Sequence, residues 1–179
     1  MTSKLSLALT IAVAALLFAL GATAQQPAQP PANPLDAIPD KMPFDVPYGA
    51  PITLDRAQSA VNAAVSEARK RGWKLVVAAV DSGGNVVTMQ RMDGAQLGSI
   101  AIAEHKARAA NQFRRETKAF ENGIQQSGFN YLITLDGVIA SRGGIPLVEN
   151  GRIIGAIGCS GGTGSQDEVA CRAGADTVK

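Results

Sequence analysis

The sequence predicts an α+β domain in which α-helices flank an antiparallel β-sheet built from two hairpins. Two observations carry this prediction: paired apolar runs around turn residues, and helical periodicity between them. The paired runs are 74–80 and 86–92 around 81–85, and 143–148 and 153–160 around Asn150-Gly151. Short apolar runs joined by Asn/Gly-rich turns are typical of β-hairpins, and hairpins alternating with helices indicate an antiparallel sheet with helices packed on it.

Composition excludes several classes of protein. The 179 residues carry 17 Lys+Arg and 15 Asp+Glu, a formal net charge of +2, so the chain lacks the strongly basic character of nucleic-acid-binding domains. One His and two Cys exclude a zinc finger, a His-rich metal cage and a multi-disulfide framework. The length suits one domain of about 100–150 residues with an appendage.

Residues 1–24 have the pattern of a signal peptide. Lys4 provides the positive start, residues 5–20 are almost entirely apolar, and Gly21 to Ala24 supply small residues before Gln25. An uncleaved anchor is the alternative, but a bilayer span needs about 20 apolar residues. We therefore expect cleavage after Ala24, a periplasmic or secreted protein, and no stable membrane insertion of the mature chain.

Residues 25–52 form a proline-rich tether that holds eight of the nine prolines. Each proline removes a backbone donor and constrains φ, so neither a helix nor a sheet is expected to propagate here. The apolar side chains of its second half are expected to lie along the folded domain; these are Met42, Phe44, Val46 and Tyr48.

The domain itself is predicted at 53–179 and begins with a helix. Thr53 is its expected cap and Gly72 its expected end, and its apolar stripe consists of Leu54, Ala57, Val61, Ala64, Val65 and Ala68. Further helices are predicted at Ser99–Arg114 and at about Thr117–Ile124. Ser165 to Glu168 reads as a capping box that opens the final helix. On the second strand, Arg91 alternates with Met89 and Val87, so all three are expected on one face.

Several segments resemble the GlcG/HbpS family, and the resemblance covers about Thr53 to Lys179. The matching motifs, in family order, are Val80–Asn85, Gln90–Ala95, Lys106-Ala107, Gly143–Leu147, and Ile154–Gly162 followed by Gln166-Asp167. This family includes secreted haem-binding proteins linked to redox sensing and the haem-binding C-terminal domain of PduO-type adenosyltransferases. The resemblance implies an antiparallel sheet flanked by helices, frequent homo-oligomers and a haem or other small-molecule ligand, but fold alone does not prove function.

His105, the only histidine, is the candidate haem ligand because imidazole is a common axial ligand. The alternative is a histidine on the flank of an amphipathic helix with no ligand. Lys106 and Arg91, with Arg108, are candidates to pair with haem propionates. The other candidate iron ligands are Met92, Thr117, Met89 and Tyr131, each of which also has a structural interpretation.

Cys159 ends a predicted strand and Cys171 lies in the following helix. An exported protein permits a disulfide between them, and two buried thiols are the alternative. The final glycine-rich turn, Gly161 to Ser165, is interpreted as a tight strand-to-helix connection, with an anion-binding nest as its alternative.

Three functions compete on this sequence. The first, which we favour, is an exported haem-binding protein with a role in haem or redox sensing or in scavenging. The second is an enzyme or enzyme-accessory domain that binds a small carboxylate, which the resemblance also allows. The third is a purely structural oligomer-forming domain. No nucleophile–base pair and no metal-ligand spacing is evident, so the sequence does not favour an enzyme.

Overall fold

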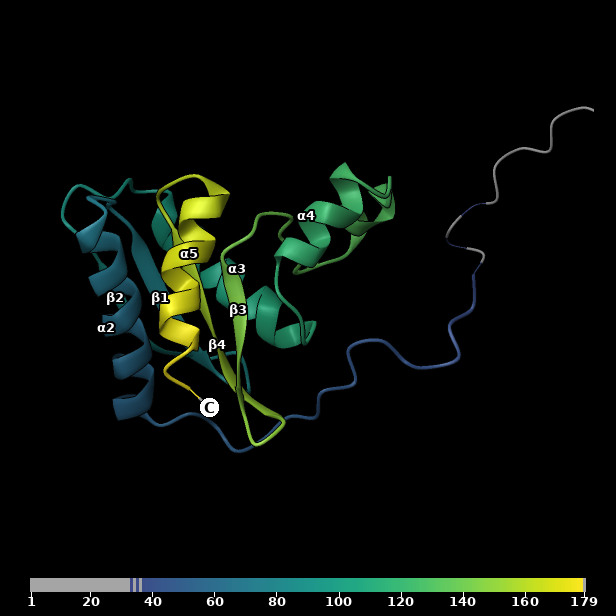
Figure 1. Ribbon diagram of the computed structural model, residues 1–179, viewed down its shortest axis with the longest axis horizontal. Helices are drawn as coiled ribbons and strands as arrows, with labels where there is room; N and C mark the ends of the chain where they lie inside the picture. The colour runs from purple at the N-terminus through teal and green to yellow at the C-terminus, as the bar shows by residue number, and fades with distance from the viewer. Residues whose placement is uncertain (1–32, 34, 36, 179) are drawn as a thin grey trace, which may run out of the picture. The chain divides into compact units, whose positions relative to one another are not determined.

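The computed structural model describes residues 33, 35 and 37–178, and residues 1–24, the predicted signal peptide, lie outside this part. The chain divides into two units, Met1–Asp40 and Lys41–Lys179. The second unit holds the helices and strands that follow (Figure 1). These elements are α2 (Leu54–Lys70), β1 (Val76–Asp81), β2 (Val86–Arg91), α3 (Ser99–Gln112), α4 (Lys118–Gln125), η2 (Asn130–Thr134), β3 (Gly144–Glu149), β4 (Arg152–Ser160) and α5 (Gly164–Ala175).

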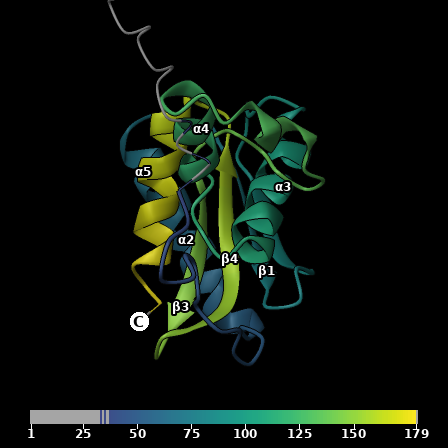
Figure 2. The ribbon, with the colours of Figure 1, turned by 90° about the vertical axis from the view of Figure 1, so that its right-hand side faces the viewer.

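The four strands form one antiparallel sheet in the order β2-β1-β4-β3, which confirms the predicted α+β class and both hairpins. β1 is buried along nearly its whole length, whereas β2 and β3 are the edges. Helices α2 and α5 cover one face and α3 covers the other, so the sheet lies between two helical layers (Figure 2). Two apolar faces buried by helices account for the continuous hydrophobic character of β1.

Helix α2 has the predicted stripe with one exception. Ala57, Val61, Ala64, Val65 and Ala68 are buried, and Ala60 joins them. The exception is Leu54, the first residue of the helix, which is half exposed. Thr53 occupies the N-cap position without a side-chain hydrogen bond, and Gly72 follows the helix at φ +71°.

Small residues let the helices approach the sheet closely. A Cβ on Gly158 of β4 would overlap the Ala103 carbonyl oxygen of α3. Across the other layer, a Cβ on Gly174 of α5 would lie 2.6 Å from the Ala60 carbonyl oxygen of α2. Larger side chains at these positions would push α3 away from the sheet and α5 away from α2, so the small residues are a packing requirement here.

The final helix starts differently from the prediction. Thr163, not Ser165, is the N-cap: its hydroxyl accepts from the Gln166 backbone N–H, and the Gln166 side chain accepts from the Thr163 N–H. The capping box therefore begins two residues earlier, because Thr163 has the extended backbone that a cap needs whereas Ser165 already lies inside α5. A Cβ on Gly161 would overlap the Lys74 carbonyl oxygen, so this glycine is required by close chain approach.

Cys159 of β4 and Cys171 of α5 form a disulfide with their Cα atoms 5.7 Å apart. Of the two alternatives that the sequence left open, a disulfide or two buried thiols, the structure has the disulfide. Both residues are fully buried, so the bond ties α5 to the centre of the sheet.

The end of the proline-rich segment, residues 47–52, lies along β4, whereas Met42, one of the apolar residues expected to lie along the domain, is 73% exposed. Gly49 donates a backbone hydrogen bond to Ile153, and Ile52 donates one to Ile154. Tyr48 donates its hydroxyl proton to the Asn111 carbonyl oxygen at 2.9 Å. Some strand-like pairing therefore occurs despite the prolines, because the hydrogen bonds are donated by the N–H groups of non-proline residues. Among the described residues, no helix is both long and apolar enough to span a bilayer.

Candidate functional site

His105 projects from the outer side of α3 and is exposed. Its Nε2 atom lies 3.2 Å from the Gly137 carbonyl oxygen, in the segment that follows η2. If Nε2 carries the proton, it donates to that carbonyl and Nδ1 keeps its lone pair. A histidine held by a backbone carbonyl through one nitrogen is a common arrangement for a metal ligand, so the imidazole can serve as a single axial ligand.

Lys106, the next residue, points into the protein and its side chain is 1% exposed. Its ammonium group donates to Asp167 Oδ2 at 2.8 Å and to the Arg142 carbonyl oxygen at 2.8 Å. Adjacent residues on a helix diverge by about 100°, so His105 and Lys106 cannot both face one ligand. This placement does not fit the role of propionate partner that the sequence predicted, because the cation is buried and engaged within the fold.

Asp167 is the ion-pair partner of Lys106, and the sequence did not predict this pairing. From the sequence, the position of Asp167 in the first turn of α5 was explained by helix capping. Its side chain is 3% exposed, and its second oxygen accepts from the Gly162 N–H at 3.0 Å. Burial raises the pKa of Asp167, against the opposing effect of the Lys106 ammonium. Gly143 packs beside this ion pair: its φ is +114°, and a Cβ there would lie 2.8 Å from Asp167 Cβ and 3.3 Å from Lys106 Nζ.

Thr117 and Met92 are also structural in this fold. The Thr117 hydroxyl donates to the Ser141 carbonyl oxygen at 2.7 Å and accepts from the Gly144 N–H at 2.9 Å. Met92 packs against the main core, and its sulfur lies 3.5 Å from the Leu75 backbone nitrogen, which donates to it. Both side chains contact other parts of the fold, so the structure gives each a packing or hydrogen-bonding role.

Arg91 ends the edge strand β2 and is exposed. Opposite partners share a face, so Arg91 and Met89, which pair with Val76 and Ala78, lie on the α3 side of the sheet. Val87 does not: the register shifts there, and Val87 packs against the core on the α2 side. The expectation that all three share one face is corrected by this β-bulge, which inserts one extra residue into β2.

The predicted haem residues thus lie in four separate places. Lys106 and Thr117 meet inside the protein beside Gly143 and Gly144, and Arg91 and Met92 lie at the β2 edge. His105 and Arg108, three residues apart, both lie on the exposed side of α3. Tyr131 lies in η2, where its side chain is 47% exposed.

A charged network surrounds the start of α5, and sequence reasoning did not identify it. Arg142 pairs with Glu121 at 2.7 Å and with Glu168 at 3.5 Å, and Lys118 donates to Glu168 at 2.9 Å. Burial acts to raise the pKa of Glu121, but hydrogen bonds from Arg142 outweigh it and lower that pKa. The same pair raises the pKa of Arg142. These residues lie far apart in sequence, so no local pattern signals the network.

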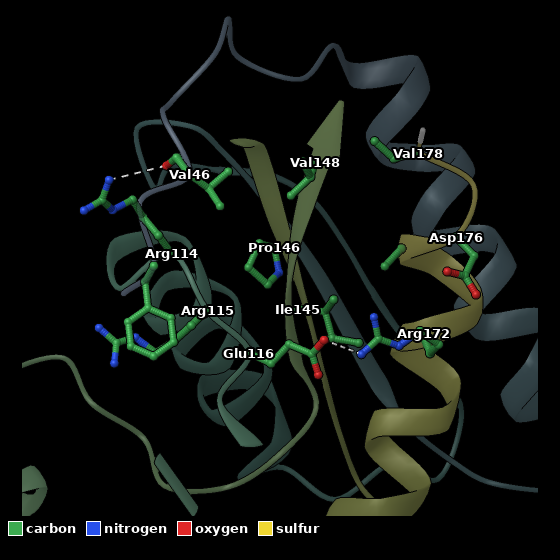
Figure 3. A pocket seen from close by; sticks show the side chains of 12 residues that line it. Val46, Arg114, Arg115, Glu116, Ile145, Pro146, Val148, Arg172, Asp176 and Val178 are labelled. Carbon is green, nitrogen blue, oxygen red and sulfur yellow. Dashed lines mark hydrogen bonds and ion pairs between the residues drawn. The ribbon is translucent and has the colours of Figure 1, made fainter. Parts of the chain in front are cut away.

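A cavity of about 430 Å³ opens beside the edge strand β3 (Figure 3). Its walls come from the proline-rich segment, the turn after α3, β3 itself and the C-terminal end of α5. Arginines and apolar side chains line it together; the arginines are Arg114, Arg115 and Arg172. His105 lies outside this cavity.

Comparison with known proteins identifies relatives for the folded unit. A family model described as "Haem degrading protein HbpS-like" matches residues 52–176. Protein GlcG of Escherichia coli K12 is 37% identical over 104 residues, which are 58% of this chain and 77% of GlcG. A solved double mutant of Streptomyces reticuli HbpS aligns with a TM-score of 0.68 and 30% identity, over 84% of this chain and 99% of that one. The PduOC:heme complex aligns with a TM-score of 0.65 and 25% identity, over 73% of this chain and 96% of that one.

Proposed function

Because the chain belongs to the HbpS-like family, as its motifs predicted, we propose that it binds haem. The observation that carries the proposal is the likeness to PduOC, a relative solved in complex with heme. His105 is the residue that we assign to the iron. Bound haem supplies an iron centre that changes its charge with its redox state, which is the chemistry that haem or redox sensing requires.

The surroundings of His105 support this assignment. The imidazole is exposed on a rigid helix, and the 3.2 Å contact with the Gly137 carbonyl oxygen orients the ring while leaving one nitrogen for a ligand. Of the cations assigned to propionates, Arg91 is exposed and has no ion-pair partner in the described part of the chain. Arg108 is half exposed and pairs with Glu104, so it can exchange that partner at little cost.

The test is a haem titration of the mature protein, followed by absorption spectroscopy. We expect saturable binding with a sharpened, shifted Soret band. His105→Ala should broaden that band and weaken binding by about 1–2 kcal/mol, the scale of one lost polar anchor. Arg91→Gln should weaken binding without changing the ligand-field bands, because propionate pairing does not touch the iron.

Two results would contradict parts of this proposal. An unchanged spectrum and affinity for His105→Ala would remove His105 as the ligand and make Tyr131 or Met89 the next candidate. A wild-type protein without saturable haem binding would overturn the proposal as a whole.

We also propose that the protein acts outside the cytoplasm after cleavage behind Ala24. The apolar run and the small residues at 21–24 support this. Intact mass of the exported protein should give a chain that begins at Gln25. A membrane-associated chain that retains Lys4 would contradict it.

A further inference from the structure

A second cavity, of about 480 Å³, lies between the proline-rich segment, the turn after α3 and η2. Its volume falls within the range of about 300–1,000 Å³ usual for small-molecule sites. Among the described residues, no acidic side chain lines it, and its charged residues are Arg114 and Arg115. The cavity beside β3, in contrast, has Glu116 and Asp176 in its walls. The second cavity is therefore the one whose charge suits an anion.

Arg115 is the cation in the second cavity that lacks a carboxylate. Arg114 lies 3.6 Å from Asp45, whereas in the described part of the chain no carboxylate lies within ion-pair distance of the Arg115 guanidinium. Burial and the neighbouring Arg114 lower the pKa of Arg115, against the opposing effect of Tyr131. A partly buried guanidinium is costly to desolvate without a counter-charge, so a bound anion would stabilise it.

The neighbours of Arg115 place its guanidinium at the second cavity. Its guanidinium carbon lies 3.5 Å from the centre of the Phe44 ring, and its Nε donates to the Phe113 carbonyl oxygen at 3.0 Å. Phe44, Phe113 and Tyr131 all line the second cavity, and Tyr131 is close enough to affect the pKa of the guanidinium. Figure 3 shows this side chain turned away from Pro146 of β3.

The two Nη atoms of Arg115 are available to a ligand. The stack on Phe44 uses the face of the guanidinium, and the bond to Phe113 uses Nε. Within the described residues, neither Nη atom has a hydrogen-bond partner. Two neighbouring N–H groups of a guanidinium match the two oxygens of a carboxylate, so the unused groups of Arg115 suit this anion.

Two residues of the second cavity have a backbone conformation that their side chains disfavour. Phe44 has φ +60° and Arg114 has φ +54°. In the described chain only one further residue other than glycine, Asn150, has a positive φ. Bulky L residues rarely adopt this conformation, and strain of this kind concentrates at ligand sites. The fold therefore accepts a conformational cost at the place where these two segments form the cavity.

We propose that the second cavity binds a small aromatic monocarboxylate. Its carboxylate accepts hydrogen bonds from the two Nη atoms of Arg115. Its ring lies against the aromatic side chains of the lining, which are Phe44, Phe113 and Tyr131. His105 lies outside this cavity, so the inference does not rest on haem binding.

The experiment is calorimetric titration of haem-free protein with benzoate, and with benzamide, which has nearly the same shape but no charge. We expect saturable binding of benzoate and none of benzamide at the same concentration. Cyclohexanecarboxylate should bind more weakly than benzoate, because a saturated ring gains no aromatic contact. Arg115→Gln should weaken benzoate binding about tenfold or more, since a charge-assisted hydrogen-bond pair is lost. Gln112→Glu, at an exposed position of the lining, should also weaken it by adding a negative charge.

Two arginine variants are the matched controls. Arg172→Gln changes a residue that lines the cavity beside β3 but not the second cavity. Arg71→Gln changes an arginine that also stacks on an aromatic ring, that of Trp73, but lies outside both cavities. Both variants should bind benzoate as the wild type does, and so should His105→Ala. Thermal unfolding of each variant checks that it is folded.

The proposal is overturned if benzoate does not bind, if benzamide or cyclohexanecarboxylate binds equally well, or if folded Arg115→Gln binds like the wild type. Should Arg115→Gln fail to fold, Gln112→Glu decides by the same criterion. Equal weakening by Arg172→Gln would assign the ligand to the cavity beside β3 and overturn the proposal as well. None of these outcomes bears on whether His105 ligates haem.

Discussion

At the residue scale, removing one partner of the Lys106–Asp167 ion pair is expected to be strongly destabilising. Both side chains are almost fully buried, so removing one leaves the other as an uncompensated charge. Lys106→Met or Asp167→Leu should each cost about 3–5 kcal/mol of unfolding free energy. The double variant Lys106→Met/Asp167→Leu should cost much less than the sum, because no buried charge remains.

Urea denaturation of the two single variants and the double variant measures this coupling. Glu67→Gln, which removes an exposed pair with Arg71, is the control and should change stability little. Additive losses in the double variant would mean that the two charges are not energetically coupled.

Glu121 should account for part of the loss of folding stability at acid pH. Its pKa in the folded protein is lowered from 4.5, so the ionised form stabilises the fold above about pH 4.5. This stabilisation is lost as the pH falls through the lowered value, because the folded state must then accept a proton that the unfolded state already holds. Glu121→Gln should lower stability at pH 7 and flatten its decline below pH 4.5. Chemical denaturation across pH 3–7 tests this, and an unchanged slope would contradict it.

At the element scale, the disulfide secures α5 against β4. The bridged residues are 12 positions apart, and a loop of about this size is expected to contribute about 3 kcal/mol. Cys159→Ala/Cys171→Ala should lose about that amount in denaturation experiments, and the wild type should lose it on reduction. If reduction leaves the midpoint unchanged while thiol labelling shows both sulfurs free, the bridge does not stabilise the domain.

At the scale of the whole molecule, we expect a symmetric homo-oligomer. Leu97, just before α3, is 75% exposed, and Ile100 and Ile102 of α3 are each 37% exposed. Apolar side chains gathered on one exposed element are typical of an interface. Light scattering at micromolar concentration should report a dimer or larger, and Leu97→Glu/Ile100→Glu should shift it toward monomer. Ile38→Glu, outside the folded unit, is the control, and a wild-type monomer would contradict the prediction.

The sequence by itself determined the class of the fold, both hairpins, the helices and the family. These features depend on local patterns: turn glycines, alternating apolar residues, helical spacing and short motifs in a fixed order. Local patterns did not predict two details: the cap of α5 lies at Thr163, two residues before the predicted position, and β2 has a bulge at Val87. A cap and a register depend on backbone geometry that several residue choices can satisfy.

The site residues were decided only by the tertiary structure. His105 and Lys106 are consecutive in the sequence, so no local pattern could show that the first is exposed and the second buried. Lys106 is buried against Asp167, which lies 61 residues further along the chain. The pairing of the two cysteines and the cavity around Arg115 likewise join distant segments. Which side chains meet across such separations depends on how the helices pack on the sheet, and that packing is a property of the whole folded chain.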